Sequence, residues 1–207
     1  MKGKFISFEG PDGSGKTSVI KVVEKYFNEK GFKTIVTREP GGIEISEKIR
    51  DIIHDVEHTE MDPRTEALLY AASRSQHLHQ KIIPAIESGI IVLCDRYVDS
   101  SLAYQGFGRE LGLDEVLAIN KFAIDSFFPD LTIFVDVRPE VGLNRVFSTA
   151  DREINRLDLE PLKFHKKIYD GYLKLIKLYP NRIKRINGEQ AIDNVAQAAI
   201  DLIKTII

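Results

Sequence analysis

Gly10-Pro11-Asp12-Gly13-Ser14-Gly15-Lys16-Thr17 is the most informative stretch of this 207-residue chain. It matches G-x-x-x-x-G-K-[ST], a pattern whose glycines let the backbone turn so that successive N–H groups point at phosphate oxygens. The β-branched and aromatic run Phe5–Glu9 precedes it, and Thr17–Asn28, with apolar residues at helical spacing, follows it. A strand, a glycine-rich turn and a helix in this order predict a phosphate-binding loop, to which the helix adds its positive N-terminal end.

Two side chains of this loop have specific chemistry, and we expect residues 10–17 as a whole to bind the phosphates of ATP. Lys16 is expected to reach the β- and γ-phosphates, and the Thr17 hydroxyl can ligate Mg²⁺. Asp95 directly follows the apolar run Ile90–Cys94, so it should lie at the same sheet edge and hold Mg²⁺ or its waters. Cys94 alternates to the other side and is expected to be a buried filler.

Outward from the loop, short β-rich runs alternate with longer helical stretches. Strands are expected at Phe5–Glu9, Thr34–Thr37, Ile90–Asp95, Leu131–Val137 and Arg182–Ile186. Helices are expected at Thr17–Asn28, Glu44–His54, Arg64–Glu87 with an interruption near Pro84, Asp114–Phe127, Pro139–Phe147, a stretch ending at Leu178, and Gln190–Ile206. This alternation predicts an α/β fold of three layers, doubly wound, with about five parallel strands. No linker divides residues 1–207, so one domain is expected, with a polar lid at about 148–160.

Composition restricts the partners. The chain has 29 Lys plus Arg against 31 Asp plus Glu, a net charge of -2, which argues against a nucleic-acid binder. The longest apolar runs, such as Ile90–Cys94, are far shorter than the roughly 20 residues of a membrane span, and Met1–Glu9 does not read as a signal peptide. One cysteine excludes an intrachain disulfide, which fits the cytoplasm. The five histidines lack metal-ligand spacing and are expected at the surface or in helix packing.

Several kinds of phosphate-loop protein remain to be weighed. Asn120-Lys121-Phe122-Ala123 lacks the Asp of the guanine-reading N/T-K-x-D motif, which argues against a GTPase. Arginines, aromatics and small polar residues in the segments after strands suit a stacked base and a monophosphate, because a guanidinium fork matches phosphate oxygens. A kinase for a nucleoside monophosphate fits best. A nucleoside kinase, which needs a general base, and a nucleotide-dependent switch without turnover are the alternatives.

Seven segments together resemble one family. They are FEGPDGSGKT (8–17), TREPGG (37–42), AASR (71–74), LCDRY (93–97), DSSLAYQG (99–106), PDLTIFVDV (129–137) and NRLDLE (155–160). In this order, across nearly the whole chain, they resemble the bacterial thymidylate kinases. The resemblance implies ATP-dependent phosphorylation of dTMP to dTDP by direct in-line transfer for dTTP synthesis, with Mg²⁺, on a nucleoside-monophosphate-kinase fold, usually as a homodimer. A kinase for another nucleoside monophosphate is the alternative.

The resemblance also assigns residues to dTMP. Arg50 and Arg96 would hold its phosphate, Tyr70 would stack on thymine, and Tyr104 would crowd the 2′ position of the sugar. Arg74, Ser100, Ser101 and Gln105 would read the base edge. Glu39 and Asp12 would lie near the sugar and the waters of the phosphate loop.

The catalytic cations are expected in the lid. Some relatives carry an arginine in the phosphate loop where this chain has Gly13, which supplies no charge. The lid instead carries Arg152 and Arg156, with Arg145 just before it. Lys16, Arg96 and Asp95 are also expected to be catalytic. Of the lid arginines, we expect Arg156 as the first candidate and Arg152 as the second to stabilise the transferring phosphoryl group, as arginine fingers do. The alternative is that these arginines only solvate a surface flap.

Overall fold

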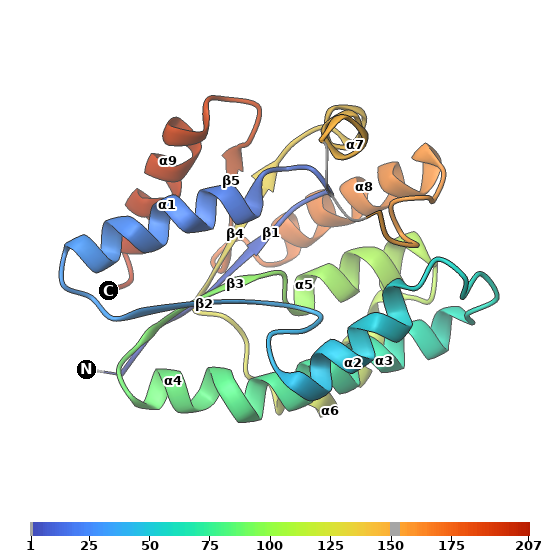
Figure 1. Ribbon diagram of the computed structural model, residues 1–207, viewed down its shortest axis with the longest axis horizontal. Coiled ribbons are helices and arrows are strands. Elements are labelled where there is room, and N and C mark those ends of the chain that lie inside the picture. The colour runs from blue at the N-terminus through green and yellow to red at the C-terminus, as the bar shows by residue number, and fades with distance from the viewer. Residues whose placement is uncertain (1, 150–153) are drawn as a thin grey trace.

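The computed structural model describes residues 2–149 and 154–207 (Figure 1). Within these ranges a single parallel sheet contains β1 (Phe5–Glu9), β2 (Thr34–Arg38), β3 (Ile91–Asp95), β4 (Leu131–Asp136) and β5 (Ile183–Asn187). The strand order is β2-β3-β1-β4-β5, which confirms the predicted α/β sheet of five parallel strands.

The register of the sheet places the phosphate loop. β1 lies between β3 and β4, and Phe8 of β1 pairs with Asp95 of β3. Because parallel strands all end at the same edge, the loop that follows Glu9 and the carboxylate that ends β3 are neighbours. The order also changes direction at β1, the position at which ligands bind in open α/β sheets.

Helices cover both faces. They are α1 (Lys16–Glu29), α2 (Glu44–His54), α3 (Pro63–His77), α4 (Ile83–Glu87), α5 (Val98–Ser101), α6 (Leu113–Ile124), α7 (Pro139–Ser148), α8 (Leu162–Leu178) and α9 (Ile192–Lys204), with π-helical segments η1 (Leu78–Ile82) and η2 (Leu102–Gly108). The sequence pattern did not predict α5 and η2.

Most helix boundaries lie within two residues of the expectation, and two differ for a structural reason. The interruption expected near Pro84 lies before it, in η1, where the Ile83 N–H donates to the carbonyl of Leu78. Pro84 follows in α4, which continues η1 without a break in the helical backbone, so the wider π-helical turn just before it accommodates a residue that has no N–H to donate. The helix expected to run to Phe127 ends at Ile124, because the next residue, Asp125, has φ 44°, a left-handed backbone that cannot continue it.

The core has two sides because side chains alternate along each strand. Phe8 and Ile133 point toward α1 and α9, where they pack with Val23. Phe5 and Val92 point to the opposite face, which α3, α4, α6 and α8 cover in Figure 1. Cys94 belongs to this second side and is fully buried, as predicted. Within the described ranges, no helix combines the length and the apolar character that a membrane crossing needs.

Candidate active site

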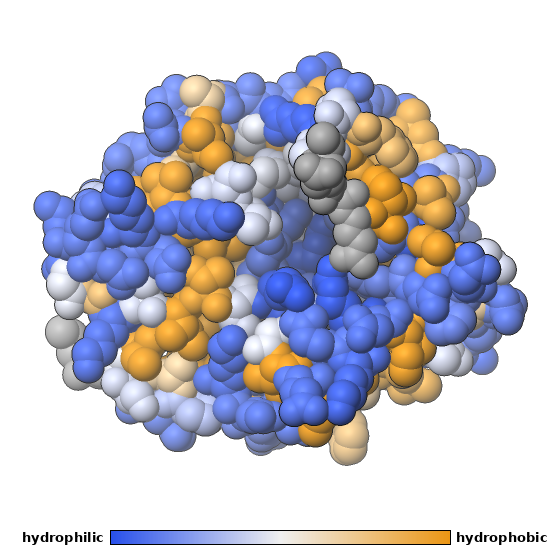
Figure 2. All heavy atoms as spheres, viewed as in Figure 1, coloured by the Kyte–Doolittle hydropathy of each residue, from blue (hydrophilic) through white to orange (hydrophobic). Residues whose placement is uncertain are grey.

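A cavity of about 660 Å³ opens at the carboxyl edge of the sheet. Figure 2 shows the hollow near the middle of one face, with hydrophilic residues around it. Every residue that the resemblance assigns to dTMP lines this cavity, together with Lys16, Thr17 and Asp95. The tertiary structure therefore brings together residues spread from position 12 to position 105. Their individual roles stay predictions.

Lys16 makes hydrogen bonds to other residues of its own phosphate loop. Lys16 Nζ donates to the carbonyl oxygens of Gly10 and Pro11 at 3.1 Å and to Ser14 Oγ at 3.3 Å. Gly10, Pro11 and Ser14 do not line the cavity, so they support the loop from behind, whereas Gly13 and Gly15 face the cavity. Burial, and secondly the Arg96 charge, lower the pKa of Lys16 to about 8.

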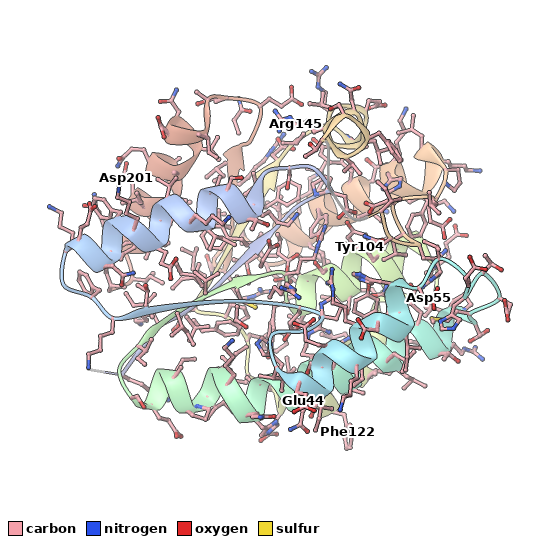
Figure 3. All side chains as sticks on the ribbon, in the orientation of Figure 1. Glu44, Asp55, Tyr104, Phe122, Arg145 and Asp201 are labelled. Carbon is pink, nitrogen blue, oxygen red and sulfur yellow. The ribbon has the colours of Figure 1, made fainter. Side chains whose placement is uncertain are left out.

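Gly13 lets α7 approach the loop. Its φ is 71°, and a Cβ there would lie 2.1 Å from the carbonyl oxygen of Gly142 in α7, so no side chain fits. This close approach brings Arg145, one turn further along α7, to the cavity, where its Nη1 donates to the Gly13 carbonyl at 3.4 Å. Figure 3 shows Arg145 at α7, above the centre of the molecule. Gly13 supplies no charge to the loop, but the Arg145 guanidinium lies beside it.

Thr17 and Asp95 form the candidate metal site. The Thr17 hydroxyl donates to Asp95 Oδ2 at 2.6 Å, and both side chains line the cavity. Hydroxyl and carboxylate oxygens are hard donors that suit Mg²⁺, which usually takes one or two protein oxygens and completes its shell with waters and phosphates. In the described part of the chain, no three His, Cys, Asp or Glu side chains gather into a metal-holding set.

Arg96 is held by Asp12 and Tyr104. Its Nη2 donates to Asp12 Oδ1 at 2.7 Å and to the Tyr104 hydroxyl at 2.9 Å, while Tyr104 donates to Asp12 Oδ2 at 2.7 Å. Figure 3 shows Tyr104 near the centre of the molecule, and its side chain is buried. Burial favours a high pKa for Asp12, but the charges of Arg96 and Lys16 hold that pKa well below its usual range. An ionised Asp12 therefore orients the guanidinium expected at the dTMP phosphate.

Arg74 is fixed by a second polar network. Its Nε donates to Glu39 Oε2 at 2.7 Å, its Nη1 to Ser101 Oγ at 2.9 Å and to Asn120 Oδ1, and its Nη2 to the Tyr97 carbonyl at 3.0 Å. One N–H on Nη2 is left without a partner among the described residues. Both carboxylate oxygens of Glu39 are occupied, by Arg74 and by His77 Nδ1 at 3.0 Å.

Sequence reasoning missed Glu9 as a site residue. This carboxyl is fully buried and accepts from the Tyr97 N–H at 2.7 Å, the Ser100 hydroxyl at 2.6 Å and the Tyr172 hydroxyl at 2.9 Å. Ser100 Oγ and the Tyr172 hydroxyl in turn accept from Arg96 Nη1. Glu9 therefore supports Arg96, whose φ of 70° is unusual for a residue with a side chain. An acid at the end of a strand, just before the glycine loop, was a signal of the same kind as Asp95.

Two histidines also have more specific environments than the sequence indicated. His77 is fully buried, and its ring joins Glu39 to the Thr37 hydroxyl, which lies 2.7 Å from Nε2. His54 lines the cavity 3.5 Å from the Tyr70 hydroxyl. Burial and the Arg50 charge lower the pKa of His54 to about 3, so its ring is neutral. No sequence spacing marks either residue, because their partners come from distant segments.

The lid arginines are placed differently from one another. Arg156 is buried away from the cavity, where its Nη2 donates to Glu66 Oε2 at 2.5 Å and its Nε to the Ile53 carbonyl at 3.2 Å. Asn155 and Leu157, on either side of it, do line the cavity. Arg152 lies outside the described residues, as do positions 150–153 of the expected lid.

Comparison with known proteins identifies the family. A family model described as thymidylate kinase matches residues 8–199. The chain belongs to the thymidylate kinase family. It is 57% identical over 203 residues to the thymidylate kinase of Clostridium novyi, covering 98% of this chain and 99% of that protein. It is 60% identical over 195 residues to that of Geobacillus sp. strain WCH70, covering 94% and 93%.

A solved thymidylate kinase has the same fold. The crystal structure of the enzyme from Ehrlichia chaffeensis superposes with a TM-score of 0.79 at 28% sequence identity, covering 99% of both chains. The resemblance seen in the sequence segments is therefore confirmed over the length of the chain, and the protein is an enzyme of this type. Thymidylate kinases use ATP as the phosphoryl donor.

Proposed function

We infer that this enzyme transfers the γ-phosphoryl group of ATP to the phosphate of dTMP, and so forms dTDP for dTTP synthesis. The observation that carries this inference is a cavity that two sets of side chains line together. One set is the phosphate loop with Lys16, and the other is a group of arginines with an aromatic side chain, Tyr70. The relatives named above support the same acceptor. Nothing observed favours another nucleoside monophosphate.

The mechanism we propose is one in-line displacement. A dTMP phosphate oxygen attacks the γ-phosphorus, the bond from that phosphorus to the β-bridging oxygen breaks, and ADP leaves with the electron pair. The acceptor is already an anion, so no general base is required. The work of the protein is positioning and charge neutralisation. Arg96 and Arg50 bind the acceptor phosphate, and Lys16 neutralises the charge of the donor.

We propose that Thr17 and Asp95 hold Mg²⁺ together with the ATP phosphates. The 2.6 Å contact between their oxygens supports this assignment. The metal would supply neutralisation of charge on the β- and γ-phosphates. Arg74 and Gln105, with Ser100 and Ser101 holding arginines behind them, would recognise the base.

We propose that the segment at about 148–160 is a lid of the single domain and that its arginines complete the site. Arg156 reaches a phosphoryl group only after it leaves Glu66, so its role requires the lid to move. Arg145 already lies beside the loop and lines the cavity, whereas Arg156 does not line it. Arg152 remains the second candidate of the lid.

We propose further that the enzyme is a cytoplasmic homodimer. α3 packs against both α2 and α6, and these helices expose the large apolar side chains Ile45, Ile52, Leu68 and Phe122. Phe122 is 94% exposed, and Figure 3 shows it projecting away from the lower edge. Apolar side chains on adjacent helices fit an interface with a second copy. The single cysteine is consistent with a reducing compartment.

An acceptor panel tests the function. Purified protein with ATP and Mg²⁺ is assayed for ADP release with dTMP, dUMP, dCMP, dAMP and UMP. We expect dTMP to have a far higher kcat/KM than dCMP, dAMP or UMP. A purine monophosphate as the best acceptor would overturn the assignment. Size-exclusion chromatography with light scattering tests the dimer, and a monomer at micromolar concentration would contradict it.

A further inference from the structure

Glu66 of α3 is a fully buried carboxylate that neither the sequence nor the mechanism above has used. Its Oε1 accepts from Gln105 Nε2 at 2.9 Å and from Arg109 Nε at 3.2 Å. Its Oε2 accepts from Arg109 Nη2 at 3.0 Å and from Arg156 Nη2 at 2.5 Å. Burial alone would raise the pKa of Glu66, but the hydrogen bonds and charge of Arg109, with those of Gln105 and Arg156, lower it. Glu66 is therefore ionised and only accepts hydrogen bonds.

An acceptor-only neighbour fixes the orientation of the Gln105 amide. The NH₂ group has to face Glu66, because the opposite orientation would set the Gln105 carbonyl oxygen against a carboxylate oxygen in a buried site. Gln105 lines the cavity, and its Oε1 accepts no hydrogen bond from the residues that the structure describes. The group that Gln105 offers to a ligand is thus an acceptor.

Arg74 also lines the cavity and supplies the complementary group. The partners described above use four of its five N–H groups, which leaves one donor. An acceptor and a donor that line one cavity match the edge of thymine or uracil, where N3–H is a donor and O4 is an acceptor. Cytosine presents the reverse pattern, with N3 as an acceptor and the 4-amino group as a donor.

We propose that Glu66 is a positioning residue which, by holding the Gln105 amide with its carbonyl toward the base, makes the pocket select a pyrimidine with an N3–H over cytosine. This proposal rests on the placement of the base beside Tyr70 and Gln105 in the proposed function. Glu66 touches no substrate and acts only through Gln105.

The test measures discrimination between two bases. In Glu66→Gln the new amide can donate or accept, so Gln105 is free to rotate and offer its NH₂ group to cytosine N3. We expect the ratio of kcat/KM for dTMP to that for dCMP to fall by at least about tenfold, the size of one mispaired buried hydrogen bond. Most of the change should be in KM for the acceptor.

Two matched variants separate positioning from a structural role. Glu66→Asp keeps an acceptor-only carboxylate, so its ratio should stay within about threefold of the wild-type value even if overall activity falls. Glu160→Gln removes a carboxylate that pairs with Arg109 in the same cluster but does not contact Gln105. In this variant too, the ratio of kcat/KM for dTMP to that for dCMP should stay near the wild-type value. A parallel loss of activity toward both acceptors in Glu66→Gln, with the ratio unchanged, would overturn the proposal.

A folding defect does not prevent the test. Circular dichroism shows whether Glu66→Gln folds, and if it does not, the double variant Glu66→Gln/Arg109→Gln removes one positive charge together with the negative one. Its ratio is compared with that of Arg109→Gln alone, and an equal ratio in the two overturns the proposal. If the wild-type enzyme does not prefer dTMP to dCMP, the placement of the base fails, and this inference fails with it. If the wild-type enzyme prefers dTMP to dCMP and Glu66→Gln keeps the same preference, only the role of Glu66 is refuted, and the proposed function stands.

Discussion

Replacement of Glu9 by glutamine should change how stability depends on pH. Glu9 is fully buried beneath Arg96, and its oxygens accept from one backbone N–H and two hydroxyls. Glutamine has the same shape. Its carbonyl can accept from the Tyr97 N–H, and its NH₂ group can donate to the oxygens of Ser100 and Tyr172. The variant therefore resembles the protonated wild-type side chain and keeps the network.

The magnitude follows from the pKa of Glu9. Burial, and secondly the Asp99 carboxylate, raise this pKa from the usual 4.5 to about 7, although Arg96 opposes them. Between these two values the folded protein holds a proton that the unfolded chain has released, so stability falls as pH rises. The full cost, about 3 kcal/mol, is present above pH 7 and absent below pH 4.5. Glu9→Gln cannot ionise and does not incur this cost.

Urea unfolding followed by circular dichroism is the assay, because the chain has no tryptophan. The free energy of unfolding of Glu9→Gln minus that of wild type is measured at pH 4.5 and at pH 8. We expect this difference to be about 3 kcal/mol larger at pH 8 than at pH 4.5, in favour of the variant. The urea midpoint of the variant relative to wild type should then rise by roughly 1 M between the two pH values. The same substitution at Glu87, which is exposed on α4, controls for the loss of one negative charge.

A difference between Glu9→Gln and wild type that stays constant from pH 4.5 to pH 8 would refute this reasoning. It would mean that Glu9 ionises in the folded protein as readily as in the unfolded chain. A change of the same size in Glu87→Gln would also refute it, because the effect would then come from net charge and not from burial.

Three further outcomes concern catalysis. Lys16→Ala should lower kcat by at least about 10²-fold and leave the circular dichroism spectrum intact, because it removes a cation from the phosphate loop without opening the core; near-normal kcat would count against its role. Arg156→Ala should lower kcat by about 10²- to 10³-fold and raise KM for dTMP much less, and a change in KM alone would make Arg156 a binding residue. Arg145→Ala should chiefly raise KM for ATP, since its guanidinium lies against the Gly13 carbonyl, and an unchanged KM for ATP would show that this contact is only structural.

Local patterns were enough to predict the architecture. Runs such as Ile90–Cys94 are apolar on both faces because a parallel sheet is covered on both faces, and the G-x-x-x-x-G-K-[ST] stretch marks the first βα turn. The boundaries that differed, at Ile83 and Asp125, depend on π-helical hydrogen bonds and a left-handed backbone that residue types indicate only weakly.

The site could be predicted as far as its residues occur in contiguous motifs. All the residues expected around dTMP line one cavity, because the fold brings the segments that follow β1, β2 and β3 together with helices α2 and α3. The sequence by itself determined which side chains are present and the family to which they belong. Only the tertiary structure decided how these side chains are held: Glu9 beneath Arg96, His77 behind Glu39, and Glu66 behind Gln105. The physical reason is that these contacts join residues 38 to 88 positions apart, and such hydrogen bonds depend on packing that no local pattern encodes.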